Sequence, residues 1–300
     1  MASKIIRIQH INHLRTGFQA NDIQEERFIE AEFFYNLQGY LTKEIHYNSL
    51  NHIESTVENE YNDDGLPILS AQYDESGELC QKNTFAYNDK GDVTRKGCFY
   101  GEFSPEYATI YVYEKGILQR EDSYDEDVFS HTEKTYEYDP KGRLHLLTEF
   151  DEDGNILYKT TDTYNEEDLL IKRLHEEVQE NDSRTFIFEY DENKHKTKEL
   201  LYNYNDKLIA KAYYRYDAEG NVIEMEEENL DIFRLTRYTY EGKNCIKIAQ
   251  FDKNDTLLSW SDYVYDDQNE ISEIKNYILD EVNPTEHRLA SEQKYITEWH

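Results

Sequence analysis

The chain has 300 residues, and its 64 acidic and 32 basic side chains give a formal net charge of −32 at pH 7. This charge argues against nucleic acids and anionic membranes as partners, since both are bound largely through Lys and Arg. It favours a basic protein partner, whose approach would be steered by charge and weakened by salt. The same acidity would also keep a long β-sheet soluble, so both interpretations stay open.

The first segment alternates in polarity, carries Lys4, Arg7 and Arg15, and contains no continuous apolar run. It therefore predicts neither a signal peptide nor a membrane span, and we expect a cytoplasmic protein or one exported without a classical signal. Four prolines and no Gly/Ser-rich stretch leave no obvious linker, which predicts a single domain over residues 1–300. Within it, residues 1–32 are expected to form an N-terminal cap with a first strand near Ile5.

Residues 33–280 repeat one phrase, which consists of an aromatic residue, Asp or Asn, two polar residues, often Gly, and an aliphatic residue. Asn or Asp at the second position can accept hydrogen bonds from the backbone that follows it, and Gly supplies the positive φ of a tight turn. Aromatic pairs two residues apart precede many of these turns, which places both rings on one face of a strand. The phrase therefore predicts strand–turn–strand units. Its clearest copies begin at Tyr73, Tyr87, Tyr138, Phe150 and Tyr216.

The spacing of the phrase predicts the architecture. The aromatic residues at positions 35, 61, 87, 113, 138, 164, 190, 216, 240 and 265 are separated by 24 to 26 residues. A looser set of turns falls midway, including Glu180–Asp182, Tyr204–Asn205 and one at Tyr277. Turns then occur about every 13 residues and leave strands of roughly nine residues. Successive turns lie at opposite ends of the strands.

We therefore predict an all-β fold of about twenty antiparallel strands in a continuous meander of hairpin repeats of roughly 26 residues. Because twist accumulates along a sheet, we expect a coiled or strongly twisted open sheet with capped ends. The alternative is a β-propeller, although no 52-residue period is visible. The stretch 174–184 predicts a long hairpin loop rather than a helical turn. Residues 281–300 predict a C-terminal cap, a loop or short helix before a last strand, Lys294–Trp299.

The repeated phrase resembles the YD repeat of the rearrangement-hotspot (Rhs) proteins, the C components of insecticidal toxin complexes and the teneurins. The resemblance covers residues 33–280 and is closest at Tyr138–Leu144, Phe150–Ile156 and Tyr216–Val222. It implies a long β-sheet strip, which in that family coils into a shell around a toxin. This chain is too short for such a chamber and lacks the Asp-rich self-cleavage motif of the Rhs core. The phrase is also similar, more weakly, to the hairpin repeats of YwqK-type antitoxins.

No catalytic motif is present, which predicts a non-enzymatic protein with no cofactor. The triplet Asp151, Asp153 and Asn155 has the spacing that opens a calcium loop but lacks the distal Glu, and turn chemistry explains it. His10 and His13 are three apart and are not expected to share a metal. The three cysteines have no metal-ligand spacing and are expected to be buried free thiols.

The Tyr/Phe stripe is expected to stabilise the sheet as cross-strand ladders, or to line a groove that recognises a protein or a glycan. We expect a protein-binding module, most concretely an acidic cytoplasmic immunity protein or antitoxin that neutralises a basic toxin. The alternatives are a structural or chaperone-like strip that cradles another chain, and a glycan-binding protein. The candidate partner-binding residues combine repeat tyrosines with the densest acidic run: Tyr111, Tyr113, Tyr136, Tyr138, Tyr214, Tyr216, Tyr238, Tyr240, Glu226, Glu227 and Glu228.

Overall fold

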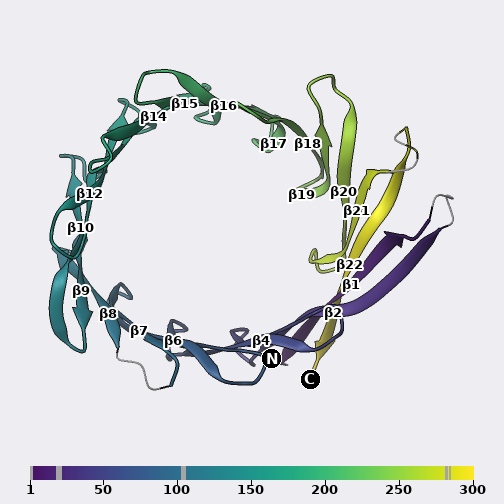
Figure 1. Ribbon diagram of the computed structural model, residues 1–300, viewed down its shortest axis with the longest axis horizontal. Helices are drawn as coiled ribbons and strands as arrows, with labels where there is room; N and C mark the ends of the chain where they lie inside the picture. Colours follow the sequence, from purple (N-terminus) through teal and green to yellow (C-terminus); the bar gives the residue numbers. More distant parts are fainter. Residues whose placement is uncertain (1–2, 18–21, 103–105, 281–282, 284) are drawn as a thin grey trace. The chain divides into compact units, whose positions relative to one another are not determined.

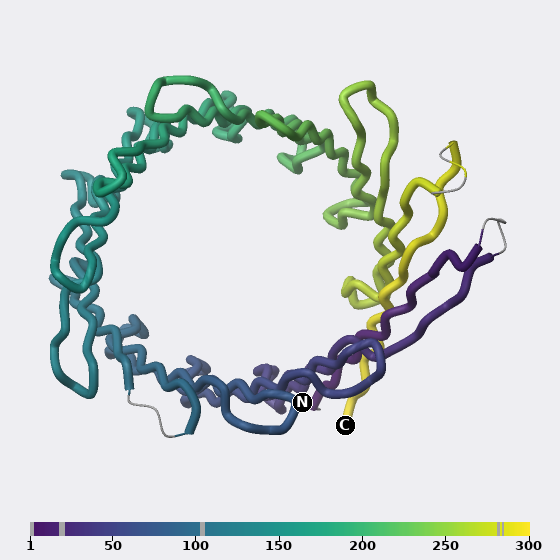
Figure 2. The backbone as a smooth tube through the Cα atoms, viewed as in Figure 1, coloured from purple at the N-terminus to yellow at the C-terminus, as the bar shows by residue number. Residues whose placement is uncertain are grey.

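The structure is a computed structural model that describes residues 3–17, 22–102, 106–280, 283 and 285–300. These residues form an all-β antiparallel meander of 22 strands. They divide into unit 1 (residues 1–86, 98–105 and 238–300) and unit 2 (residues 87–97 and 106–237). Each unit is a single layer of strands joined by short hairpin turns, which Figure 2 traces along the backbone.

Unit 1 holds the two ends of the chain. Its strands are β1 (Lys4–Arg15), β2 (Ile23–Tyr35), β3 (Leu41–Tyr47), β4 (Ile53–Tyr61), β5 (Pro67–Tyr73), β19 (Asn244–Phe251), β20 (Leu257–Tyr265), β21 (Ile271–Leu279) and β22 (His287–Trp299). Unit 2 contains β8 (Tyr107–Glu114), β9 (Ile117–Asp125), β10 (Val128–Tyr138), β11 (Leu144–Phe150), β12 (Ile156–Tyr164), β13 (Leu170–Glu177), β14 (Asp182–Tyr190), β15 (Lys196–Asn203), β16 (Leu208–Tyr216) and β17 (Val222–Asn229). Strands β6 (Leu79–Tyr87), β7 (Val93–Tyr100) and β18 (Phe233–Glu241) have residues in both units.

The first and last strands of the chain pair with each other. β1 pairs with β2 on one side, and on the other with β22 from Lys4 opposite Trp299 to Asn12 opposite Ser291. The purple and yellow strands of Figure 1 therefore lie side by side. The expected open sheet with two capped ends is wrong, because each terminal strand satisfies the backbone groups that the other would leave unpaired. The propeller alternative is also wrong, since strands within each unit pair continuously with their sequence neighbours instead of forming separate blades.

Other boundaries differ from the expected ones in both terminal regions and in one loop. The last strand begins at His287, so the expected loop or helix ahead of Lys294 is largely strand. Tyr277 lies inside β21 and makes no turn. The expected long loop at 174–184 shrinks to residues 178–181 between β13 and β14. Parts of both expected caps, residues 1–2, 18–21, 281–282 and 284, lie outside the described residues.

The repeated phrase forms the turns that its chemistry predicts. At Asp139, for example, Oδ1 accepts hydrogen bonds from the backbone N–H groups of Lys141 (2.8 Å) and Arg143 (3.0 Å), and Gly142 has a φ of 82°. Turns without glycine keep this geometry, for example with Asp168 at a φ of 66° and Lys194 at 68°. Asx chemistry and one left-handed residue therefore set the turn, whether or not that residue is glycine.

A tyrosine hydroxyl fastens most of the repeats in the same way. The last Tyr of one strand donates a hydrogen bond to the backbone carbonyl of a residue twenty positions earlier, at or next to the start of the preceding strand. We call this contact a tyrosine clasp. Burial raises the pKa of all these tyrosines above the ordinary value. The seven clasps join Tyr61 to Leu41, Tyr113 to Val93, Tyr138 to Leu118, Tyr164 to Leu144, Tyr190 to Leu170, Tyr216 to Lys196 and Tyr265 to Cys245, at 2.7–3.0 Å.

The sheet has very little hydrophobic core. Its accessible surface is 18780 Å², whereas a compact protein of the same mass exposes about 13,300 Å². The buried apolar side chains among the described residues are mostly small: Ile11, Ala31, Ala71, Ala108, Leu235 and Ala249. Most side chains on both faces therefore stay at least partly exposed, and stability depends on the ladders, clasps and turns.

Candidate functional site

A hollow on one face of unit 2 brings aromatic and acidic side chains together. Strand register places its residues on the same face: Phe186 pairs with Leu201, Leu201 with Ala210, and Glu199 with Ala212. Ala212 also pairs with Glu227, which pairs in turn with Arg234. With Tyr214, two residues beyond Ala212, and with Lys211, Glu228, Asn229 and Ile232, these residues line a cavity of about 250 Å³. We call this cavity the acidic hollow, and the lining residues that share one face by strand register are Phe186, Glu199, Leu201, Ala210, Ala212, Tyr214, Glu227 and Arg234.

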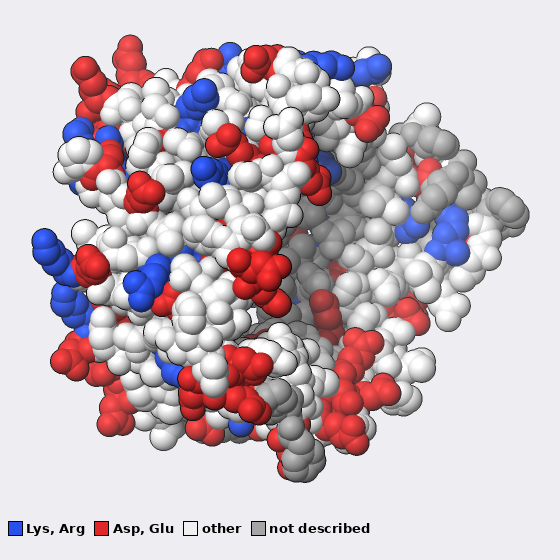
Figure 3. Space-filling view, turned by 60° about the vertical axis from the view of Figure 1, so that its left-hand side comes forward, with Lys and Arg blue, Asp and Glu red and all other residues white. Residues whose placement is uncertain are grey.

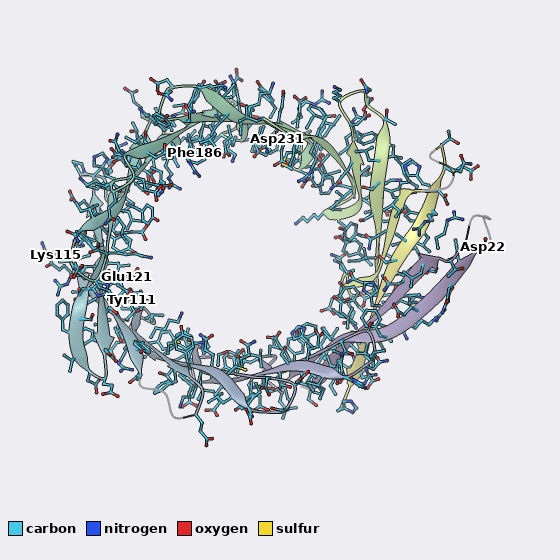
Figure 4. The ribbon with its side chains drawn as sticks, in the orientation of Figure 1. Asp22, Tyr111, Lys115, Glu121, Phe186 and Asp231 are labelled. Atoms are coloured by element: carbon cyan, nitrogen blue, oxygen red, sulfur yellow. The ribbon has the colours of Figure 1, made fainter. Side chains whose placement is uncertain are left out.

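Two small residues create the depression. Ala210 and Ala212 are two residues apart on β16, so both face the same side of the sheet. Other repeats carry larger side chains at the equivalent positions. Unit 2 is curved (Figure 1), and Phe186 points to its concave side together with Tyr111 and Glu121 (Figure 4). The acidic hollow therefore opens on the concave face of unit 2.

Lys196 already places a cation against aromatic rings and a carboxylate on this face of the sheet. Its ammonium lies 4.9 Å from the ring centroid of Tyr214 and 5.6 Å from that of Phe188, and it donates to Glu199 Oε2 at 2.6 Å. Burial lowers its pKa and the Glu199 carboxylate raises it, and the net result is a raised pKa. A cation held between aromatic faces and a carboxylate is thus already part of the structure.

Glu227 is less well satisfied than Glu199. Its Oε2 atom is shielded from solvent and has no hydrogen-bond partner among the described residues. Arg234 Nη1 lies 3.7 Å away, within ion-pair range but beyond hydrogen-bonding distance. A shielded carboxylate oxygen without a donor is unfavourable, so this position has unused capacity to accept a hydrogen bond.

A second hollow of about 330 Å³ lies on the same face and shares Phe186. It contains Arg173, His175 and Arg184, with Leu144, Leu147 and Thr160. Arg173 is held by two 2.7 Å hydrogen bonds to the buried carboxylate of Asp162. Phe186 therefore separates an acidic hollow from a basic one. Figure 3 shows basic side chains scattered among acidic ones on the face of the molecule that it presents.

The candidate residues expected from the sequence separate into several groups. Tyr214, Glu227 and Glu228 line the acidic hollow. Glu226, which precedes Glu227 on β17, does not line it, and Glu228 is 2.6 Å from Lys211 Nζ. Tyr238 and Tyr240 lie on β18 within unit 1, outside the hollow.

The remaining candidate tyrosines have structural partners. Tyr113, Tyr138 and Tyr216 donate their hydroxyls to the clasps. Tyr136 donates to Glu121, which lies opposite Tyr111 in the β8–β9 ladder. Burial first, and then contact with Glu121, raises the pKa of Tyr136 well above its ordinary range. Sequence reasoning missed Phe186, Glu199, Ala210 and Ala212, although the Ala-Lys-Ala spacing on an aromatic-rich strand is a signal that could have indicated a depression.

The other sequence-level candidates have ordinary partners. His10 contacts Glu30 (3.0 Å) and Asn12 (2.9 Å), and His13 contacts Glu292 (2.8 Å). No group of three or more metal-ligating side chains occurs among the residues that the structure describes. The thiols are free, but they are not buried as expected, since Cys80 is exposed and Cys98 and Cys245 are partly exposed. Asp151 forms the expected Asx turn, accepting from Asn155 N at 2.7 Å.

No helix in the described part of the chain is long and apolar enough to cross a membrane. No family known from sequence matches the chain, and no curated protein matches it. Solved structures do show similarity. A crystal structure of TcdB2-TccC3 without its hypervariable C-terminal region aligns over 95% of this chain at 13% identity and a TM-score of 0.46. A porin-like protein from Bacteroides uniformis aligns over 97% of both chains at 10% identity and a TM-score of 0.36.

A porin-like protein from Bacteroides vulgatus aligns over 80% of this chain and 93% of its own, at 11% identity and a TM-score of 0.28. The present chain spans only 19% of the TcdB2-TccC3 structure. Structural neighbours thus include a toxin complex, in line with the YD-like phrase. At these levels of similarity they carry no argument about function.

Proposed function

We propose that this chain is a non-enzymatic protein-binding module that uses the acidic hollow to hold a basic side chain of its partner. The observation that carries the proposal is the Glu227 carboxylate, which lines the same hollow as Tyr214 and Phe186 and has an oxygen without a hydrogen-bond donor among the described residues. A Lys or Arg side chain would supply that donor and a cation for the aromatic faces. The excess of acidic residues would speed the approach of such a partner.

The most concrete form of this function is an acidic cytoplasmic immunity protein or antitoxin that neutralises a basic toxin. The net charge of −32 supports this form. In addition, the shared face of unit 2 offers hollows of opposite charge, which would fix the register of one partner and disfavour others. A structural or chaperone-like strip is the second form, and we expect such a strip to hold its partner largely independently of Glu227.

Capture of partners from the native lysate across a salt series tests the proposal. Wild type is compared with Glu227→Gln and with Glu226→Gln, which removes the same charge from the preceding residue of β17, outside the lining of the hollow. The expected result is one basic protein that is lost as salt rises. The Glu227→Gln variant should bind it roughly 10- to 100-fold more weakly, because a charged hydrogen bond is lost. Equal weakening by both variants, or binding that survives high salt, would sink the proposal.

A further inference from the structure

A groove in unit 1 lies on the strands that join the two ends of the chain. It has a volume of about 890 Å³, within the range of small-molecule sites. Its lining is mainly apolar and aromatic, with Tyr35, Leu37, Tyr295 and Trp299, and one ion pair, Lys4 with Glu270. We call it the aromatic groove. It shares no residue with either hollow of unit 2.

The aromatic groove places two rings at a defined separation. Tyr35 and Trp299 both lie directly opposite Lys4, on the two strands that flank β1. Two inter-strand spacings therefore separate their backbones, about 9.6 Å. Trp299 is 54% exposed, so much of its surface is available for a ligand.

An ion pair lies between the rings. The Lys4 ammonium is 5.9 Å from the Tyr35 ring centroid and 5.5 Å from that of Trp299, and it donates to both carboxylate oxygens of Glu270 at 2.8 and 2.9 Å. The charges in the groove are thus balanced internally, and a charged ligand would find no unpaired counter-ion. The carboxylate retains acceptor sites on both oxygens.

These features select the class of ligand. A purely apolar molecule that covered the groove would remove the Lys4–Glu270 pair from water without replacing its hydrogen bonds, which is unfavourable. An anionic ligand would meet the negative field of the whole chain. A neutral saccharide presents an apolar ring face for stacking and hydroxyl groups for the ion pair, and adjacent sugar rings can reach both Tyr35 and Trp299.

We propose that the aromatic groove binds a neutral oligosaccharide, with sugar rings stacked on Trp299 and Tyr35 and hydroxyl groups bonded to Glu270 and Lys4. The site is separate from the acidic hollow, and its occupancy does not depend on the proposed protein partner.

The chain provides a convenient reporter for this proposal. Trp260 is stacked on Tyr277 with ring centroids 4.5 Å apart, whereas Trp299 is exposed. In the Trp260→Phe variant, Trp299 is the remaining tryptophan, and its quenching by acrylamide reports occupancy of the groove. The probes are neutral tetrasaccharides of glucose, N-acetylglucosamine, galactose and mannose at millimolar concentration, with galacturonic acid oligomers and the uncharged apolar dye N-phenyl-1-naphthylamine for comparison.

The expected result is that at least one neutral tetrasaccharide protects Trp299 from quenching, while the acidic oligomers and the dye do not. By calorimetry, Trp299→Ala should weaken that sugar at least about tenfold, and Tyr158→Ala on unit 2 should leave it unchanged. Glu270→Gln should weaken it less than Glu270→Ala does. Protection by none of the neutral sugars overturns the proposal, as does preferential binding of the dye. Glu227→Gln should not affect sugar binding, so the two proposals can fail separately.

Discussion

The tyrosine clasps predict a measurable and additive loss of stability. The Tyr190→Phe substitution keeps the ring in place and removes the hydroxyl that donates to the Leu170 carbonyl at 2.8 Å. The net loss for one such hydrogen bond is about 1 kcal/mol, which corresponds to a fall of roughly 1.5 °C in the unfolding temperature of a chain of this length.

Three clasps in unit 2 can be removed together. Tyr164, Tyr190 and Tyr216 lie at the ends of alternate strands, β12, β14 and β16. They are therefore about 9.6 Å apart and should act almost independently. The triple Phe variant should lose about 3 kcal/mol of unfolding free energy, measured from urea denaturation.

The matched control is Tyr213→Phe, on the same strand as Tyr216. Tyr213 is 37% exposed, and its hydroxyl makes no hydrogen bond to the described residues. This variant should unfold within about 0.5 kcal/mol of wild type. Hydrogen exchange would localise the effect of Tyr190→Phe to β13 and β14. If the triple variant and the control share one urea midpoint, the clasps contribute nothing and the reasoning is refuted.

Three further predictions concern turns, pH and a buried charge. Lys194→Gly should raise the unfolding free energy by up to about 1 kcal/mol, since Lys194 has a φ of 68°. Asn193→Gly should not raise it, because Asn193 has no positive φ. Equal urea midpoints for the two variants would contradict this prediction. Burial raises the pKa of the clasp tyrosines in the folded state, so these residues should stabilise the fold fully below about pH 10 and lose that contribution as pH rises through the raised values. The triple Phe variant should therefore show a shallower loss of stability in alkaline urea titrations than wild type, and parallel curves would argue against this origin. Arg173→Gln should lower the unfolding free energy by about 3 kcal/mol, because it leaves the buried Asp162 carboxylate without its cation. Lys141→Gln removes the exposed Lys141–Asp168 pair and should lower the unfolding free energy by less than about 1 kcal/mol. Similar losses of unfolding free energy in the Arg173 and Lys141 variants would count against the role of burial.

The hairpin architecture could be predicted from the sequence because its causes are local. Asp139 bonds the two backbone N–H groups that follow it, and Gly142 supplies the left-handed conformation. The period of this phrase fixed the strand length and the antiparallel order. Even the turns at Asp168 and Lys194, which lack glycine, kept the expected place. Local chemistry repeated at a regular interval is therefore sufficient to predict strands and turns.

The pairing of the chain ends could not be predicted in this way, since it depends on contacts almost 300 residues apart. Lys4 lies opposite Trp299, yet neither position has a local signal that identifies the other. The β-bulges could not be predicted from the sequence either. A register shift just before the last aromatic residue recurs, for example at Glu137/Tyr138 and Glu189/Tyr190, and it ends the regular alternation on which the expected aromatic pairing rested.

Many aromatic residues have structural roles, which explains why aromatic content did not predict the location of the candidate site. A tyrosine that recurs in every repeat, such as Tyr138 or Tyr216, is committed to a clasp, and its hydroxyl is already used. Recognition needs features that differ between repeats, because a uniform strip would bind in many registers. Ala212 and Glu227 are such departures from the repeat, and they create a local depression with an incompletely satisfied carboxylate. In a sheet whose stability comes from repeated contacts, we therefore expect specific binding at the positions whose residues differ from those of the other repeats.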